Sequence, residues 1–216
     1  ILIGPRGFGL FSNSIFEAAT SPTLVTVALF VLMGEILFRS GTVDVLFNSV
    51  DRLVGRLKGR LYVVSIALST VFGALSGSAV AVAAMLGRSV LPLMEKRNYD
   101  TRISAVTILS GASLAPIIPP SLLAIIVGSL ADVSIAGLLV AGIIPGLIFA
   151  ALTLSYVYLR GGEMPPPEPA ASDQPVWRAI ANMLPFLLVI LSVMGLIMLG
   201  IATPSESAAT GVLGAL

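Results

Sequence analysis

The sequence predicts an all-α polytopic membrane protein. Hydrophobic residues make up 56% of its 216 residues and charged residues only 11%, whereas an ordinary soluble domain carries about 25% charged residues. The apolar residues lie in long runs that are separated by short polar segments containing glycine, proline and basic residues. Within this class we expect a re-entrant helical hairpin followed by a proline-broken helix.

Composition also narrows the classes of function. The net charge is only +1, which gives no reason to expect nucleic acid as a partner. The sequence has no His and no Cys, which excludes thiol and imidazole chemistry and the usual zinc sites. The chain starts inside one apolar run and stops inside another, so we expect it to be part of a longer protein.

Residues 1–60 form the first predicted unit. An aromatic entry segment leads into a transmembrane helix over 23–38, which ends in a cationic last turn at Arg39. Glu35 lies four residues before Arg39 on the same helical face. We favour an i,i+4 ion pair near the interface, and a functional intramembrane carboxylate is the alternative. Over 42–60, apolar residues recur at helical spacing between charged ones, which predicts an amphipathic helix on the cytoplasmic surface.

Residues 61–96 form the predicted re-entrant hairpin. A straight helix over the apolar stretch 61–94 would overshoot a bilayer core of ~30 Å. Basic residues flank both ends, and because such residues mark the cytoplasmic side, the chain must turn inside the membrane. We expect the turn at Ser76-Gly77-Ser78, where glycine permits a reversal and hydroxyls satisfy freed backbone groups. A small-residue packing contact is the simpler alternative for this tripeptide. The flanking basic residues are Arg52, Arg56, Lys58 and Arg60 on one side and Lys96, Arg97 and Arg102 on the other.

Other charged residues agree with one topology. Basic residues place 39–60, 96–102, Arg160 and Arg178 inside, whereas the acidic turns at Asp132 and 203–206 lie outside. Arg88 departs from this pattern because it lies within the second arm of the hairpin. We favour an Arg88 side chain that snorkels to the cytoplasmic interface, and a binding site is the alternative.

Residues 97–160 are predicted to form a broken helix and a return transmembrane helix. The break falls at Pro116-Ile-Ile-Pro-Pro-Ser121, where three prolines lie within five residues. Each proline lacks an N–H and clashes with the carbonyl four residues earlier. The freed carbonyls need water, another chain segment or a cation as a partner, although prolines are also common in transmembrane helices for packing alone. The carbonyls concerned are those of Ala112, Ala115 and Pro116.

The last part of the chain repeats the alternation of polar and apolar segments. Residues 161–177 are rich in proline and predict a stiff cytoplasmic linker. Residues 178–216 are predicted to hold a further transmembrane helix and, after the turn at 203–206, the start of another apolar segment.

A re-entrant hairpin next to a proline-broken helix is typical of secondary transporters, which use both to place helix ends and bare carbonyls near the bilayer midplane. The chain strongly resembles the large membrane subunit (DctM-like) of tripartite ATP-independent periplasmic (TRAP) transporters over nearly its whole length. The residues that carry the resemblance are Gly73-Ala-Leu-Ser-Gly-Ser-Ala-Val80, Leu91-Pro92, Tyr99-Asp100, Pro116-Ile-Ile-Pro-Pro-Ser121, Val133-Ser-Ile135, Ala141-Gly-Ile-Ile-Pro-Gly146 and Gly200-Ile-Ala-Thr-Pro-Ser-Glu206.

This resemblance implies the first half of an inverted-repeat, elevator-type transporter of the prokaryotic inner (plasma) membrane, with the second repeat opening near the end of the chain. It also implies coupling to Na+, a small membrane subunit (DctQ-like) and a periplasmic substrate-binding protein (DctP-like) as partners. The implied substrates are organic acids of the C4-dicarboxylate, keto acid or sialic acid class.

The resemblance further implies a sodium site that joins the hairpin tip to the broken helix. The matching positions are Ser76 and Ser78 at the tip and the main-chain carbonyls of Ala115, Ile118 and Pro120 in the break. The proline argument independently favours Ala115, since Pro119 removes the helical partner of its carbonyl.

Two departures from the family pattern bear on this site. The family usually has an aspartate where this chain has Val82, which removes a carboxylate from the second arm of the hairpin. It also has Gly-Pro where this chain has Ala115-Pro116, a change that leaves a carbonyl-based site intact.

Two other functions remain open at this point. A stand-alone sodium–anion symporter would use the same hairpin and break without a binding protein. An intramembrane enzyme with Ser76 or Ser78 as nucleophile would need a general base, and the apolar core has neither His nor Lys.

Overall fold

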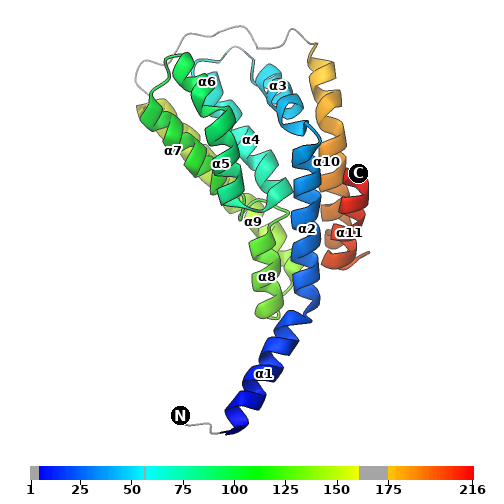
Figure 1. Ribbon diagram of the computed structural model, residues 1–216. Helices are drawn as coiled ribbons and strands as arrows, with labels where there is room; N and C mark the ends of the chain where they lie inside the picture. Colours follow the sequence, from blue (N-terminus) through cyan, green and yellow to red (C-terminus); the bar gives the residue numbers. More distant parts are fainter. Residues whose placement is uncertain (1–4, 56, 161–174) are drawn as a thin grey trace.

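The computed structural model describes residues 5–55, 57–160 and 175–216, and these ranges form helices joined by short turns without any strand. The helices are α1 (Pro5–Ala19), α2 (Pro22–Arg39), α3 (Thr42–Val54), α4 (Arg60–Ser76), α5 (Ala79–Ser89), α6 (Leu91–Lys96), α7 (Thr101–Ala112), α8 (Leu122–Leu130), α9 (Ile135–Arg160), α10 (Val176–Met198) and α11 (Pro204–Ala215). In Figure 1, α2 runs along the molecule with α4 to α7 on one side and α10 and α11 on the other. Arg56 and most of the predicted linker over 161–177 lie outside the described residues.

The prediction of a helical membrane protein is confirmed. Within the described ranges, α9 and α10 are each long and apolar enough to cross a membrane, and residues 23–39 and 44–54 make a third candidate span if their bent pair is counted as one. Both long helices expose large apolar side chains, among them Leu147, Leu152 and Leu191 at 63% each. Such surfaces suit contact with lipid, because the bilayer core is apolar and contains no water.

The predicted hairpin is present as two helices that fold back on each other. Helix α4 ends at Ser76, Gly77 adopts φ of 61°, and α5 begins at Ala79. Only glycine adopts this left-handed conformation without steric cost. Figure 1 shows the start of α4 and the whole of α6 at the same end of the molecule, as a re-entrant hairpin requires. Which side of a membrane that end faces stays a prediction.

The second arm of the hairpin is divided into two helices. Helix α5 ends at Ser89 and α6 begins at Leu91. The cause is Pro92, which has no N–H and whose ring opposes the carbonyl of Arg88. Pro92 occupies the first turn of α6, where a missing N–H costs nothing.

The predicted amphipathic helix over 42–60 is shorter than expected. Helix α3 bends away from α2 by 78° and ends at Val54. The next residue, Gly55, has φ of 68°, which stops the helix. Helix α3 buries Leu46 and Val50 and packs against α4 and α10.

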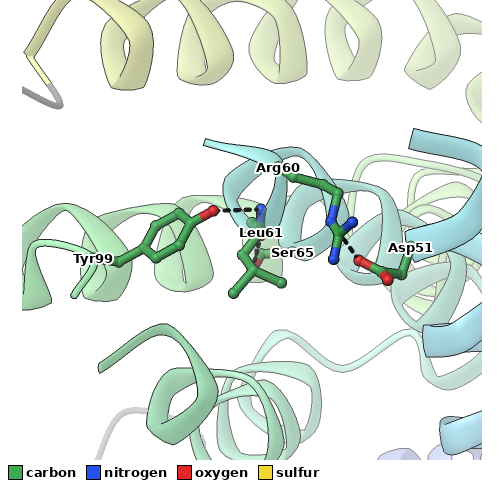
Figure 2. A network of polar contacts seen from close by, with 5 residues as sticks. All are labelled: Asp51, Arg60, Leu61, Ser65 and Tyr99. Atoms are coloured by element: carbon green, nitrogen blue, oxygen red, sulfur yellow. Dashed lines mark hydrogen bonds and ion pairs between the residues drawn. The ribbon is translucent and has the colours of Figure 1, made fainter. Parts of the chain in front are cut away.

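A buried polar network joins α3, α4 and the turn before α7 (Figure 2). Arg60 Nε lies 2.8 Å from Asp51 Oδ1, and the two side chains are 4% and 1% exposed. The N–H of Leu61 donates a hydrogen bond to the Tyr99 hydroxyl at 3.4 Å, and the Ser65 hydroxyl donates to the Leu61 carbonyl at 2.7 Å. The first turn of α4 is therefore held from two sides.

Arg60, one of the predicted flanking cations, is therefore buried in an ion pair. The sequence pattern could not show this, because the pairing of Arg60 with Asp51 depends on how α3 folds back against α4 across the intervening loop. The ion pair stabilises this end of the hairpin only while both charges are present, since a buried charge without its partner is strongly destabilising.

We expect Arg60→Leu to lower the free energy of unfolding by about 3–5 kcal/mol, because the buried Asp51 carboxylate would lose its ion pair with Arg60. Thermal unfolding of the purified protein in detergent measures this. The matched control is Arg39→Leu, which removes a cation from the exposed pair with Glu35 and should cost at most about 1 kcal/mol. Equal melting temperatures for the two variants would contradict a stabilising role for the buried pair.

Candidate functional site

The hairpin tip and the proline break lie against each other near the middle of the molecule (Figure 1). A Cβ added at Gly73, in the last turns of α4, would lie 2.7 Å from the Cα of Ala115. A Cβ at Gly77, at the tip, would lie 2.6 Å from the Cγ of Leu122. Both distances are shorter than van der Waals contact, so the two segments can approach this closely only because glycine stands at both positions.

Helix α9 holds the break from another side. A Cβ added at Gly142 would lie 2.4 Å from the carbonyl oxygen of Ile117, and one at Gly146 would lie 2.7 Å from the side chain of Ile118. The irregular backbone is therefore packed between α4 and α9. This arrangement is the one in which non-helical backbone is tolerated at membrane depth.

Hydrogen bonds satisfy some of the carbonyls at the break. The carbonyl of Ala112 accepts from the N–H of Ala115 at 3.1 Å, and the carbonyl of Pro116 accepts from the hydroxyl of Ser121 at 2.5 Å. The carbonyl of Ala115 accepts no hydrogen bond from the described part of the chain. Of the three carbonyls that the prolines were predicted to free, the Ala115 carbonyl is thus the one that accepts no hydrogen bond from the described residues.

The oxygen atoms of the other predicted sodium ligands can also accept a further interaction. Across the ranges that the structure describes, the carbonyls of Ile118 and Pro120 also accept no hydrogen bond. The Ser76 hydroxyl oxygen accepts from the N–H of Ser78 at 3.3 Å, and that of Ser78 accepts from the N–H of Ala81 at 3.3 Å. Each hydroxyl oxygen therefore keeps a second lone pair.

This set of oxygens is neutral, which suits a hard monovalent cation. Unwound carbonyls at a broken helix are the groups that coordinate Na+ in secondary transporters. No cluster of three or more His, Cys, Asp or Glu side chains that could hold a metal occurs within the described residues. The structure brings the tip and the break together, and the role of the five residues as sodium ligands stays a prediction.

A cleft of about 720 Å³ opens beside the tip, between α2 and α5. Most of its wall is apolar, but five polar or charged side chains line it: Glu35, Ser76, Ser78, Arg88 and Ser89. The sequence left Arg88 between two interpretations, and the structure places it on this wall.

The remaining residues singled out in the sequence have clear positions. Glu35 forms the predicted ion pair with Arg39 on α2. Val82 is fully buried and does not line the cleft, so the position at which we expected the family's aspartate lies on the packed face of α5. The close contacts of Gly73 and Gly142 were not predicted, and the only available signal was glycine within apolar helices.

Comparison with known proteins agrees with this architecture. A family model described as "Tripartite ATP-independent periplasmic transporter, DctM component" matches residues 7–216. Over 195 residues the chain is 37% identical to the uncharacterized protein YgiK of Salmonella typhimurium, covering 88% of this chain and 44% of that protein.

Two other relatives are named for what they transport. The chain is 32% identical over 208 residues to the 2,3-diketo-L-gulonate TRAP transporter large permease protein YiaN of Escherichia coli, covering 96% of this chain and 49% of YiaN. It is 36% identical over 195 residues to the ectoine TRAP transporter large permease protein TeaC of Halomonas elongata, covering 88% and 45%. Further relatives are named for sialic acid and for C4-dicarboxylates. The chain spans about half the length of these relatives.

We expect Gly142→Ala to destabilise the protein by about 1–3 kcal/mol, because the added methyl group would collide with a backbone carbonyl that cannot move without shifting the break. The measurement is thermal unfolding in detergent. Gly195→Ala in α10 is the matched control, since nothing lies within 4 Å of its added Cβ. That variant should be neutral or more stable by up to about 1 kcal/mol. Indistinguishable melting curves for the two variants would show that α9 does not hold the break.

Proposed function

The chain belongs to the DctM family of tripartite ATP-independent periplasmic transporters, and we propose that it carries out sodium-coupled uptake of organic acid anions delivered by a periplasmic binding protein. Family membership makes it a transport component of the inner membrane, with several membrane passes, and not an enzyme. Sodium coupling, the elevator movement and the substrate class are parts of the proposal.

The proposal includes two protein partners. A tripartite system needs a small membrane subunit, which we expect to be DctQ-like, and a periplasmic binding protein, which we expect to be DctP-like. The exposed apolar surfaces of α9 and α10 offer room for contact with lipid and with such a subunit.

The observation that carries the sodium proposal is the Ala115 carbonyl. It lies in a packed break beside the hairpin tip and accepts no hydrogen bond within the described part of the chain. A buried carbonyl left in this state costs free energy unless an ion or water completes it. A sodium ion held by Ala115, Ile118 and Pro120 together with Ser76 and Ser78 would satisfy it and bind the tip to the break.

The substrate class rests on the chemistry of the compounds for which the relatives are named. Diketogulonate, ectoine, sialic acid and C4-dicarboxylates each carry at least one carboxylate. A cleft of about 720 Å³ next to the hairpin tip is within the usual size of a small-molecule site. We therefore propose a carboxylate-bearing anion as the transported molecule.

We expect the double variant Ser76→Ala and Ser78→Ala to raise the sodium concentration for half-maximal uptake about tenfold, because two ligand oxygens replacing the ion's hydration shell would be lost. The assay is uptake into liposomes holding the complete transporter with its partner subunits and binding protein.

Ser155→Ala serves as the matched control for this experiment. Ser155 is an exposed serine of α9 whose hydroxyl donates to the Ala151 carbonyl at 2.8 Å. Its replacement should leave sodium dependence unchanged. Wild-type sodium dependence in the double variant would refute the assignment of the tip hydroxyls.

A further inference from the structure

One face of α5 forms a wall of the cleft beside the hairpin tip. Five of its lining residues belong to α5 and recur at the spacing of one helical face: Ala81, Ala84, Met85, Arg88 and Ser89. The face begins with two alanines next to the tip and ends with a cation. The opposite wall comes from α2. The cleft therefore has a hydroxyl-bearing end at Ser76 and Ser78 and a basic end at Arg88.

Arg88 is the basic residue of the cleft lining, and its charge is not neutralised by an ion pair with the described residues. It forms no ion pair or hydrogen bond with the residues that the structure describes. The other charged residue of the wall, Glu35, is already paired with Arg39 one turn further along α2. An anion that entered the cleft would thus meet an uncompensated guanidinium at one end.

The dimensions suit an organic acid. Arg88 follows Ser78 by ten residues, which is about 15 Å along a helix axis. Helical side chains lean toward the N-terminus of their helix, so a long arginine side chain on α5 shortens the distance to the tip. Between Arg88 and the tip, the α5 wall carries Ala81 and Ala84, whose small side chains leave room for a bound molecule.

We infer that Arg88 binds a carboxylate group of the transported anion in the cleft between α2 and α5. This inference rests on the proposed transport of organic acids and adds the residue that recognises their charge. The guanidinium group presents two parallel N–H donors that match a carboxylate. The tip hydroxyls line the same cleft next to the proposed sodium site, so that the bound anion and the cation would attract each other.

This role differs from snorkelling in a measurable way. A snorkelling arginine needs only water or lipid headgroups around its charge, and replacing it would leave anion affinity unchanged. A carboxylate-binding arginine sets the affinity for anions and leaves the affinity for uncharged analogues unaltered.

The test uses the complete transporter, purified in detergent with sodium present. Binding of succinate, pyruvate and N-acetylneuraminate is measured by calorimetry, with uncharged succinamide as the matched analogue of succinate. We expect Arg88→Gln to raise the Kd of every carboxylate that binds the wild type by roughly tenfold to a hundredfold, the effect of losing a hydrogen bond to a charged group. Arg88→Lys should recover part of the affinity, because it restores the charge without the paired donors.

Arg102→Gln is the control variant. Arg102 is an exposed cation of α7 that does not line the cleft, so its loss should leave the Kd values unchanged. Equal weakening by Arg88→Gln and Arg102→Gln would indicate a general effect of charge and overturn the inference. So would unchanged affinity in Arg88→Gln, or a wild type that binds none of the three carboxylates.

Sodium-driven uptake separates the inference from the proposed function. If uptake of a carboxylate depends on sodium but its KM is unaltered in Arg88→Gln, the proposed function stands and the role of Arg88 is wrong. If binding depends on Arg88 but uptake is independent of sodium, the role of Arg88 stands and the proposed sodium coupling is wrong.

Discussion

Backbone carbonyls at membrane depth have no water to bond with, and this constraint governs the structure around the proline break. The segment between α7 and α8 cannot form a helix, so its polar groups must be satisfied in other ways. The Ser121 hydroxyl donates a hydrogen bond to the Pro116 carbonyl, and the N–H of Ala115 donates one to the Ala112 carbonyl. The Ala115 carbonyl accepts nothing from the described part of the chain. This unmet acceptor is the observation behind the proposed sodium site.

Glycine residues let the hairpin, the proline break and α9 approach one another closely. Gly73 and Gly77 bring the hairpin against the break, and Gly142 brings α9 against the Ile117 carbonyl. These contacts pack the tip, the break and α9 directly against one another. The proposed sodium ion at the break would therefore also contact the hairpin tip. The cleft lies beside this junction, between α5 and α2.

Local chemistry explains how much of this could be predicted from the sequence. The tip at Ser76-Gly77-Ser78 and the interruption after Ala112 were predictable because glycine and proline act on their own neighbourhood. The division of the second arm at Pro92 had the same kind of signal and was missed. The pairing of Arg60 with Asp51 and the position of Arg88 opposite α2 could not be predicted, since both depend on how separate helices pack. The sequence marks where the chain bends, and packing decides which side chains then meet.

We propose that a sodium ion joins the hairpin tip to the proline break. The most direct measurement is an electron cryomicroscopy structure of the complete transporter, determined once in sodium and once in potassium as the only alkali cation. We expect density for an ion in sodium between the hydroxyls of Ser76 and Ser78 and the carbonyls of Ala115, Ile118 and Pro120, and none there in potassium. A tip and a break that pack in the same way in both salts, with no ion between them, would contradict the proposed sodium site.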